Sequence, residues 1–167
     1  MKKAVLVIDM QNVCVGKNRS SYFKYDTDNL LKAVNDVIEY NKDGLIVYIK
    51  NIMKRNFINK FAPFEAYAGT EAVELVDNLK IVSNNVFDKY TGDAFSNPEL
   101  HKFFSDEKVD VVEIVGVDGG GCVSLTAIGA LKNGYKVIMN TKAIGTTFEK
   151  NRDKYFKKLE KLGAEFI

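Results

Sequence analysis

Three residues of this 167-residue chain combine side-chain types used in nucleophilic hydrolysis with positions at the ends of apolar segments. Asp9 follows the run AVLVI, Lys89 stands just beyond the run IVSNNVF, and Cys122 follows three consecutive glycines. A cysteine nucleophile needs a base to take its proton and a group that stabilises its negative charge. Aspartate and lysine can serve these two roles, so the three residues form a candidate set for nucleophilic chemistry at a thiol.

The more common partner of a cysteine nucleophile is histidine, and the chain has one, His101. It lies inside a helix predicted from Asn97 to about Asp106, away from the carboxyl end of any predicted strand. A surface or helix-packing histidine is the favoured interpretation, so a Cys–His pair is not expected.

The surroundings of Cys122 support a functional role for this cysteine. A mostly β-branched run at 110–117 predicts a buried strand, the glycines at 119–121 follow, and apolar residues then recur at helical spacing. Cys122 would therefore open a helix, where the helix dipole stabilises a thiolate. The alternative is a small apolar cysteine that packs at the start of a helix.

Strands and helices alternate along the chain, which predicts a three-layer α/β/α, Rossmann-like fold in one domain, residues 1–167. The sheet is expected to be largely parallel, with five or six strands. The predicted strands are 4–8, 45–49, 81–87, 110–117, 135–139 and 164–167. The predicted helices are 26 or 28 to about 41, a short one at 70–76, 97–106, one from 122, and 148–162.

The predicted topology places the three candidate residues together. In an open α/β sheet, ligands bind beyond the carboxyl ends of the strands. Asp9, Lys89 and Cys122 each follow a different predicted strand, so one edge of the sheet should carry all three.

Composition limits the partners of the protein. The chain is 46% hydrophobic with a net charge of +2 and has no basic arm, so nucleic acid is not an expected partner. Neither a signal-peptide core nor a membrane span is found in the sequence, so no membrane association is expected. Two cysteines cannot form a disulfide framework, and we expect a cytoplasmic protein.

Three sequence blocks carry a resemblance to a known family. They are AVLVIDMQN, KYTGDAF and GVDGGGCVSLTAIGALKNGYKV, and they occur in the family's order. With these blocks the chain resembles the isochorismatase-like cysteine hydrolase superfamily, which includes nicotinamidases and N-carbamoylsarcosine amidohydrolases.

The resemblance implies a mechanism for the three candidate residues. Asp9 would be the base, Lys89 would stabilise the thiolate, and Cys122 would attack an amide, ureide or carbamoyl carbon to form a thioester. The backbone amides of Asp118 and Cys122 would form the oxyanion hole, and the peptide bond Val117–Asp118 would be cis. The resemblance also implies a small-molecule substrate and a homodimer or homotetramer.

The chain departs from the family in ways that bear on cofactor and substrate. Nicotinamidases carry an Asp-x-His…His metal site after the second strand, but the matching YIKNIMKRNFINK contains neither histidine nor aspartate. We therefore expect no metal and no other cofactor, and nicotinamide is a disfavoured substrate. Gly119 replaces a family threonine and Asp93 a family serine. Asp93 would place a negative charge near Lys89 or be a solvated loop acid.

The predicted substrate pocket draws on the loops near the first two strands. Cys14, Phe57, Phe61 and Tyr67 are its candidate walls, with Asp93 and Gly119. For Cys14, burial within the loop is the alternative interpretation.

Three other functions remain open from the sequence. The chain could be a catalytically silent small-molecule-binding member of this fold, or an isochorismatase-type vinyl-ether hydrolase. It could also be a thiol redox protein that uses Cys14 and Cys122. The presence of Cys122 favours C–N hydrolysis, because members that act on isochorismate often lack the cysteine.

Overall fold

The computed structural model describes residues 1–167 and contains one six-stranded, all-parallel sheet. The strand order is β3-β2-β1-β4-β5-β6. The strands are β1 (Lys2–Ile8), β2 (Leu45–Asn51), β3 (Val86–Lys89), β4 (Val109–Val117), β5 (Lys136–Gly145) and β6 (Glu165–Phe166). The predicted α/β class and largely parallel sheet are confirmed.

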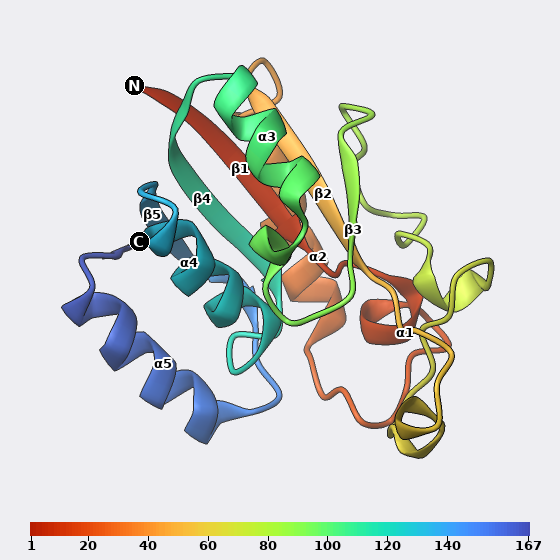
Figure 1. Cartoon of the computed structure of the whole chain (residues 1–167). Helices are drawn as coiled ribbons and strands as arrows, with labels where there is room; N and C mark the ends of the chain where they lie inside the picture. The colour runs from red at the N-terminus through yellow and green to blue at the C-terminus, as the bar shows by residue number, and fades with distance from the viewer.

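Helices cover both faces of the sheet (Figure 1). They are α1 (Asn12–Val15), α2 (Thr27–Tyr40), α3 (Pro98–Asp106), α4 (Cys122–Lys132) and α5 (Glu149–Lys161). Alternate residues of β1 divide between the two layers: Val5 and Val7 belong to the core with α2, while Leu6 belongs to the core with α3, α4 and α5. This alternation follows from the two-residue period of a strand and explains why β1 is apolar throughout.

Two helix starts confirm the capping signals in the sequence. The side chain of Asn97 accepts a hydrogen bond from the backbone N–H of Glu99 at 2.9 Å, and Pro98 takes the first helical position of α3. Asp26 caps α2 through the N–H of Asn29 at 3.4 Å.

The third strand differs from its prediction over 81–87. It begins only at Val86 and pairs with the last four residues of β2. Before it, side chains replace the strand ladder: the hydroxyl of Tyr48 donates to the carbonyl of Lys80 and accepts from the N–H of Val82. Because these backbone groups bond a side chain, the segment does not join the sheet.

Other boundaries also differ from their predictions. Residues 70–76 form only one 3₁₀ turn, η2 (Glu71–Val73), and the turns η1 (Ile58–Phe61) and η3 (Ala94–Ser96) were not predicted. β5 extends to Gly145 because Ile144 and Gly145 pair with the end of β4. None of the five α-helices combines the length and the apolar character that crossing a bilayer requires.

The topological switch point lies between β1 and β4. The chain continues from β1 to β2 and β3 on one side, then returns to β4 on the other side. The two central strands approach closely because Gly116, at φ +109°, has no Cβ to collide with the carbonyl oxygen of Ile8. A crevice at such a point is where ligands bind in open α/β sheets, and Asp9 follows Ile8 directly.

Candidate active site

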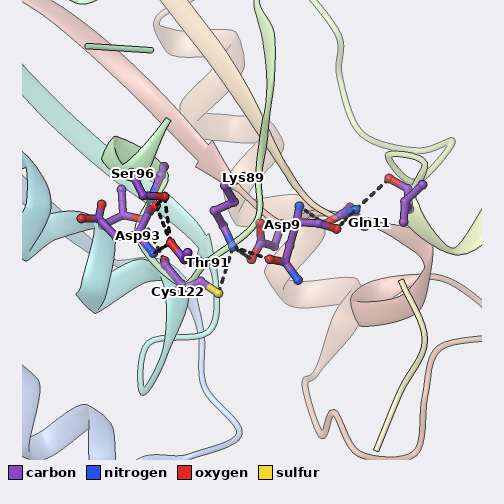
Figure 2. Close-up of polar contacts among 12 residues, drawn as sticks. Asp9, Gln11, Lys89, Thr91, Asp93, Ser96 and Cys122 are labelled. Atoms are coloured by element: carbon purple, nitrogen blue, oxygen red, sulfur yellow. Dashed lines mark hydrogen bonds and ion pairs between the residues drawn. The ribbon is translucent and has the colours of Figure 1, made fainter. Parts of the chain in front are cut away.

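Asp9, Lys89 and Cys122 meet at the carboxyl edge of the sheet (Figure 2). The Nζ of Lys89 lies 2.9 Å from Asp9 Oδ2 and 3.1 Å from Cys122 Sγ. Asp9 follows β1, Lys89 ends β3, and Cys122 is the first residue of α4. The structure thus brings together three side chains that are far apart in the sequence.

The backbone and carboxylate of Asp9 are both unusual. Asp9 has φ +53°, and its N–H donates to the carbonyl of Ile49 at 3.0 Å. Non-glycine residues in this region are strained and cluster at functional sites. The side chain is buried, and its Oδ1 has no hydrogen-bond partner. Burial raises the pKa of Asp9, although Lys89 opposes that shift. An unpaired buried oxygen is a ready acceptor for a proton.

Lys89 is almost fully buried yet remains charged through its neighbours. Burial by itself lowers the pKa of an ammonium group, but the negative charge of Asp9 and the hydrogen bonds to Asp9 and Cys122 outweigh it and raise the pKa of Lys89. Its third contact is Asn51 Oδ1, at 3.1 Å. An ammonium with three fixed acceptors holds the carboxylate and the sulfur in one geometry.

Cys122 differs in one respect from the expectation of a stabilised thiolate. Burial, with the negative charge of Asp9, raises the pKa of Cys122 to about 12, although Lys89 opposes the shift. The position at a helix start does not overcome these two effects. The resting sulfur is therefore a thiol beside a carboxylate, and its proton must leave during attack.

The loop before Cys122 leaves two backbone donors free. The N–H groups of the residues at 119, 120, 121 and 123 each donate a hydrogen bond within the loop region. Those of Asp118 and Cys122 donate to no protein acceptor. The peptide bond Val117–Asp118 is cis, at the position that the resemblance indicates. Two free amides beside a sulfur have the composition of an oxyanion hole.

Sequence reasoning missed two residues of the site, Asn51 and Gln11. Gln11 is fully buried; its Oε1 accepts from the N–H of Asn51 at 2.8 Å, and its Nε2 donates to the carbonyls of Asn51 and Val73 at 3.2 and 2.8 Å. Gln11 therefore fixes the end of β2, where Asn51 contacts Lys89. Asn51 ends a strand, so the rule that singled out Asp9 would also have found it.

Comparison with known proteins places this site in a family. The family model described as "Isochorismatase domain" matches residues 3–167. The chain belongs to the isochorismatase family. This membership confirms the expected family and supports a hydrolase.

Solved structures share the fold of this isochorismatase-family chain. The zinc complex of the pyrazinamidase of Pyrococcus horikoshii has a TM-score of 0.86 at 22% identity, with 100% of this chain and 99% of that chain covered. The N-carbamoylsarcosine amidase of Thermoplasma acidophilum has 0.82 at 24% identity, with 99% and 95% covered. An isochorismatase-like hydrolase from Alkaliphilus metalliredigens has 0.83 at 24% identity, with 99% and 94% covered. A comparison with curated proteins finds no match.

The zinc of the pyrazinamidase complex raises the question whether this family member could hold the same metal. Zinc binds cysteine, histidine and carboxylate ligands. No group of three or more such side chains is placed to hold an ion. At the end of β2 stands Asn51, whose side-chain oxygen Oδ1 already accepts from the ammonium of Lys89, and the ring of His101 bonds the hydroxyl of Tyr135 at 2.9 Å. The donor set does not fit zinc.

Cys14 and Tyr67, two predicted pocket walls, are buried. Cys14 lies in α1 within the core beneath the site, and burial together with the negative charge of Asp9 raises its pKa. Tyr67 carries the guanidinium of Arg55 4.6 Å above its ring. Cys14 therefore adjoins the site, whereas Tyr67 stabilises the 51–70 connection.

Phe57 and Phe61 lie on the outer surface. Their side chains are 75% and 76% exposed, and the two rings contact each other edge-to-face at 5.3 Å. The structure does not bring them to Cys122, because the connection after β2 turns their rings towards solvent.

Asp93 and Gly119, two positions at which the chain departs from the family, contact neighbouring protein segments. The carboxylate of Asp93 accepts from the N–H of Phe95 at 2.9 Å and lies against Gly129, on the far side of the Lys89–Cys122 contact (Figure 2). A Cβ at Gly119 would collide with the side chains of Thr146 and Ile144. The two departures from the family thus serve local structure: Asp93 caps a turn, and Gly119 permits close packing.

Proposed function

We propose that this isochorismatase-family protein is a metal-independent cysteine hydrolase that cleaves a C–N bond in a small amide, ureide or carbamoyl compound. The observation that carries the proposal is the single ammonium of Lys89, which bridges Asp9 Oδ2 and Cys122 Sγ while Asp9 Oδ1 has no partner. This arrangement supplies a nucleophile, a base and a fixed positive charge in one contact.

The first half-reaction transfers the acyl group to sulfur. Sγ of Cys122 attacks the carbonyl carbon, and the thiol proton passes to Asp9. The raised pKa values of Cys122 and Asp9 allow this transfer, because burial disfavours both anions. Lys89 offsets the negative charge that the pair carries throughout. The leaving nitrogen then takes the proton from Asp9 as the C–N bond breaks.

The tetrahedral intermediate places a negative charge on the former carbonyl oxygen. The free N–H groups of Asp118 and Cys122 are suited to bind it, since neither is used within the protein. Loss of one oxyanion donor costs about 100–1,000-fold in rate in a hydrolase of this kind. The glycine loop is therefore part of the catalytic machinery.

The second half-reaction releases the acid. Asp9, again a carboxylate, takes a proton from water, and the resulting hydroxide attacks the thioester carbon of the acyl-Cys122. The C–S bond breaks, and the departing sulfur takes the proton back from Asp9, which restores the thiol and the carboxylate and leaves the acid product. No step calls on a metal, and the donor set around Asn51 offers none.

A screen for liberated ammonia tests the proposal. Purified protein is incubated with a panel of amides, ureides and carbamoyl compounds, with Cys122→Ala as the control. We expect at least one compound to release ammonia from the wild type and none from the variant. Turnover that persists in Cys122→Ala would refute a covalent mechanism. A reactive Cys122 without turnover on any compound would favour a binding-only protein.

A further inference from the structure

The carboxylate of Asp118 is the hub of a hydrogen-bond network next to the two free amides. Asp118 is 6% exposed. Its Oδ1 accepts from the N–H of Gly120 at 2.6 Å, and its Oδ2 accepts from the hydroxyl of Tyr25 at 2.8 Å and the N–H of Thr147 at 2.5 Å. Three donors from three chain segments thus satisfy one buried carboxylate.

The glycine loop needs such restraint. Three consecutive glycines have more conformational freedom than any other tripeptide, and fixing them costs entropy. By binding the N–H of Gly120, the Asp118 carboxylate removes that amide from competition for a substrate oxygen. The same contact fixes the chain on either side of Gly119, so the amides of Asp118 and Cys122 keep one orientation.

The segment after β5 supports the loop from its other side. The N–H of Gly119 donates to the carbonyl of Gly145 at 2.9 Å, and a Cβ at Gly120 would collide with the carbonyl oxygen of Phe148. Thr147 is itself held, because its hydroxyl accepts from the N–H of Lys24 at 2.9 Å. The loop therefore fits against residues 145–148 only with glycine at 120.

The hydroxyl of Tyr25 donates to the Asp118 carboxylate and stays protonated at every working pH. Its ring is buried and stacks on Phe23 with centroids 5.8 Å apart. Burial, with the negative charge of Asp118, raises the pKa of the Tyr25 phenol far above its ordinary value. The hydroxyl consequently keeps its proton across the working pH range and always faces Asp118 as a donor.

We propose that the side chains of Asp118 and Tyr25 are positioning residues that hold the oxyanion-binding amides of Asp118 and Cys122 in place. This inference rests on the proposed function. Neither side chain contacts the substrate in this proposal; both act through the backbone of the glycine loop.

Two reagents separate positioning from general structural support. p-Nitrophenyl acetate acylates a thiol through a tetrahedral oxyanion: the S–C bond forms, the C–O bond breaks, and p-nitrophenolate leaves while Asp9 takes the thiol proton. Iodoacetamide alkylates the same sulfur by displacement of iodide, with no oxyanion. The burst of nitrophenolate and the rate of alkylation are measured on wild type, Tyr25→Phe and Asp118→Asn.

We expect Tyr25→Phe and Asp118→Asn to slow acylation by about tenfold or more, since displaced oxyanion donors lose much of their effect. Alkylation should stay within about twofold of wild type in both variants. Tyr25→Phe removes one oxygen from a ring that remains packed, so it gives a folded test even where Asp118→Asn is unstable. Tyr48→Phe is the matched control, because Tyr48 is also buried but its hydroxyl bonds Lys80; both rates should remain unchanged.

Equal falls in the two rates would overturn the proposal and assign these side chains a general structural role. Unchanged acylation in both variants would overturn it as well, as would a wild type that iodoacetamide alkylates but the ester does not acylate. A wild-type Cys122 that is inert to both reagents would instead contradict the proposed function itself.

Discussion

Two lysine–carboxylate pairs on the sheet have a buried carboxylate, and they differ in how completely that carboxylate is hydrogen-bonded. Lys3, near the start of β1, lies 2.6 Å from Glu113 Oε2, and Asn140 donates to the other oxygen at 2.8 Å. Lys89 lies 2.9 Å from Asp9 Oδ2, and the other oxygen has no partner.

The difference separates a structural ion pair from a reactive one. The Lys3 side chain is 36% exposed, and both carboxylate oxygens of Glu113 accept hydrogen bonds. Glu113 therefore has no free oxygen that could accept a proton from a neighbouring group. Lys89 is fully buried, and its carboxylate partner keeps one oxygen free beside a thiol. Buried polar groups are normally satisfied, and the exception coincides with the nucleophile.

Replacing Asp9 should have the largest effect on activity. Asp9→Asn keeps the shape but removes the base, and we expect turnover to fall by about 1,000-fold, within the range for lost general-base catalysis. Glu113→Gln is the matched substitution in the structural pair and should leave turnover unchanged. Ammonia release measures both. Similar losses of turnover in Asp9→Asn and Glu113→Gln would contradict the assignment of one pair as reactive and the other as structural.

Removing the buried cation should have the largest effect on stability. Lys89→Met leaves Asp9 buried without its partner, a change that typically costs about 3–5 kcal/mol of unfolding free energy. Urea unfolding monitored by circular dichroism measures the unfolding free energies of the wild type and the variant. A loss below about 1 kcal/mol would show that Asp9 is readily protonated or hydrated without Lys89.

Breaking the structural pair should be milder. In Glu113→Gln, Lys3 can turn to solvent while the amide still accepts from Asn140, so we expect a loss of about 1.5–3 kcal/mol, the value of a hydrogen bond to a charged group. The same unfolding measurement applies. The rate of Cys122 alkylation should match the wild type; a fall would mean that the two pairs are coupled.

The raised pKa of Asp9 predicts a pH signature for the reactive pair alone. Because the carboxylate is the base, alkylation and turnover should fall as pH drops through a pKa above the ordinary 3.8. The native state holds its proton more tightly than the unfolded state, so the contribution of Asp9 to stability declines as pH rises from 3.8 to that pKa. Activity profiles from pH 3.5 to 8 measure the shift. An acid limb at or below 3.8 would contradict it.

Much of this site was predictable because strand ends are visible in the sequence. Apolar runs place Asp9, Lys89 and the glycine loop at one edge of a parallel sheet without knowledge of the packing. The loops were not predictable in the same way. Phe57 and Phe61 are apolar, but whether a loop turns them inward or outward depends on tertiary contacts that leave no periodic pattern.

The raised pKa of Cys122 and the network of Asp118 also escaped sequence reasoning. A helix start predicts a stabilised thiolate, but the depth of burial and the distance to Asp9 reverse the shift. Asp118 contacts Tyr25 and Thr147 across gaps of 93 and 29 residues. The Thr147 contact exists only once the carboxyl ends of β4 and β5 lie side by side, and the Tyr25 contact only once the segment before α2 packs against them.

Alkylation at pH 7 followed by peptide mapping tests the central claim most directly, because the protein contains its own comparison. Cys14 and Cys122 are the only cysteines, and Cys14 is buried in the core. With iodoacetamide we expect one label per chain, on Cys122, and a loss of that labelling in Asp9→Asn. Labelling of Cys122 that is no faster than that of Cys14, or that persists unchanged in Asp9→Asn, would contradict a nucleophile activated by Asp9.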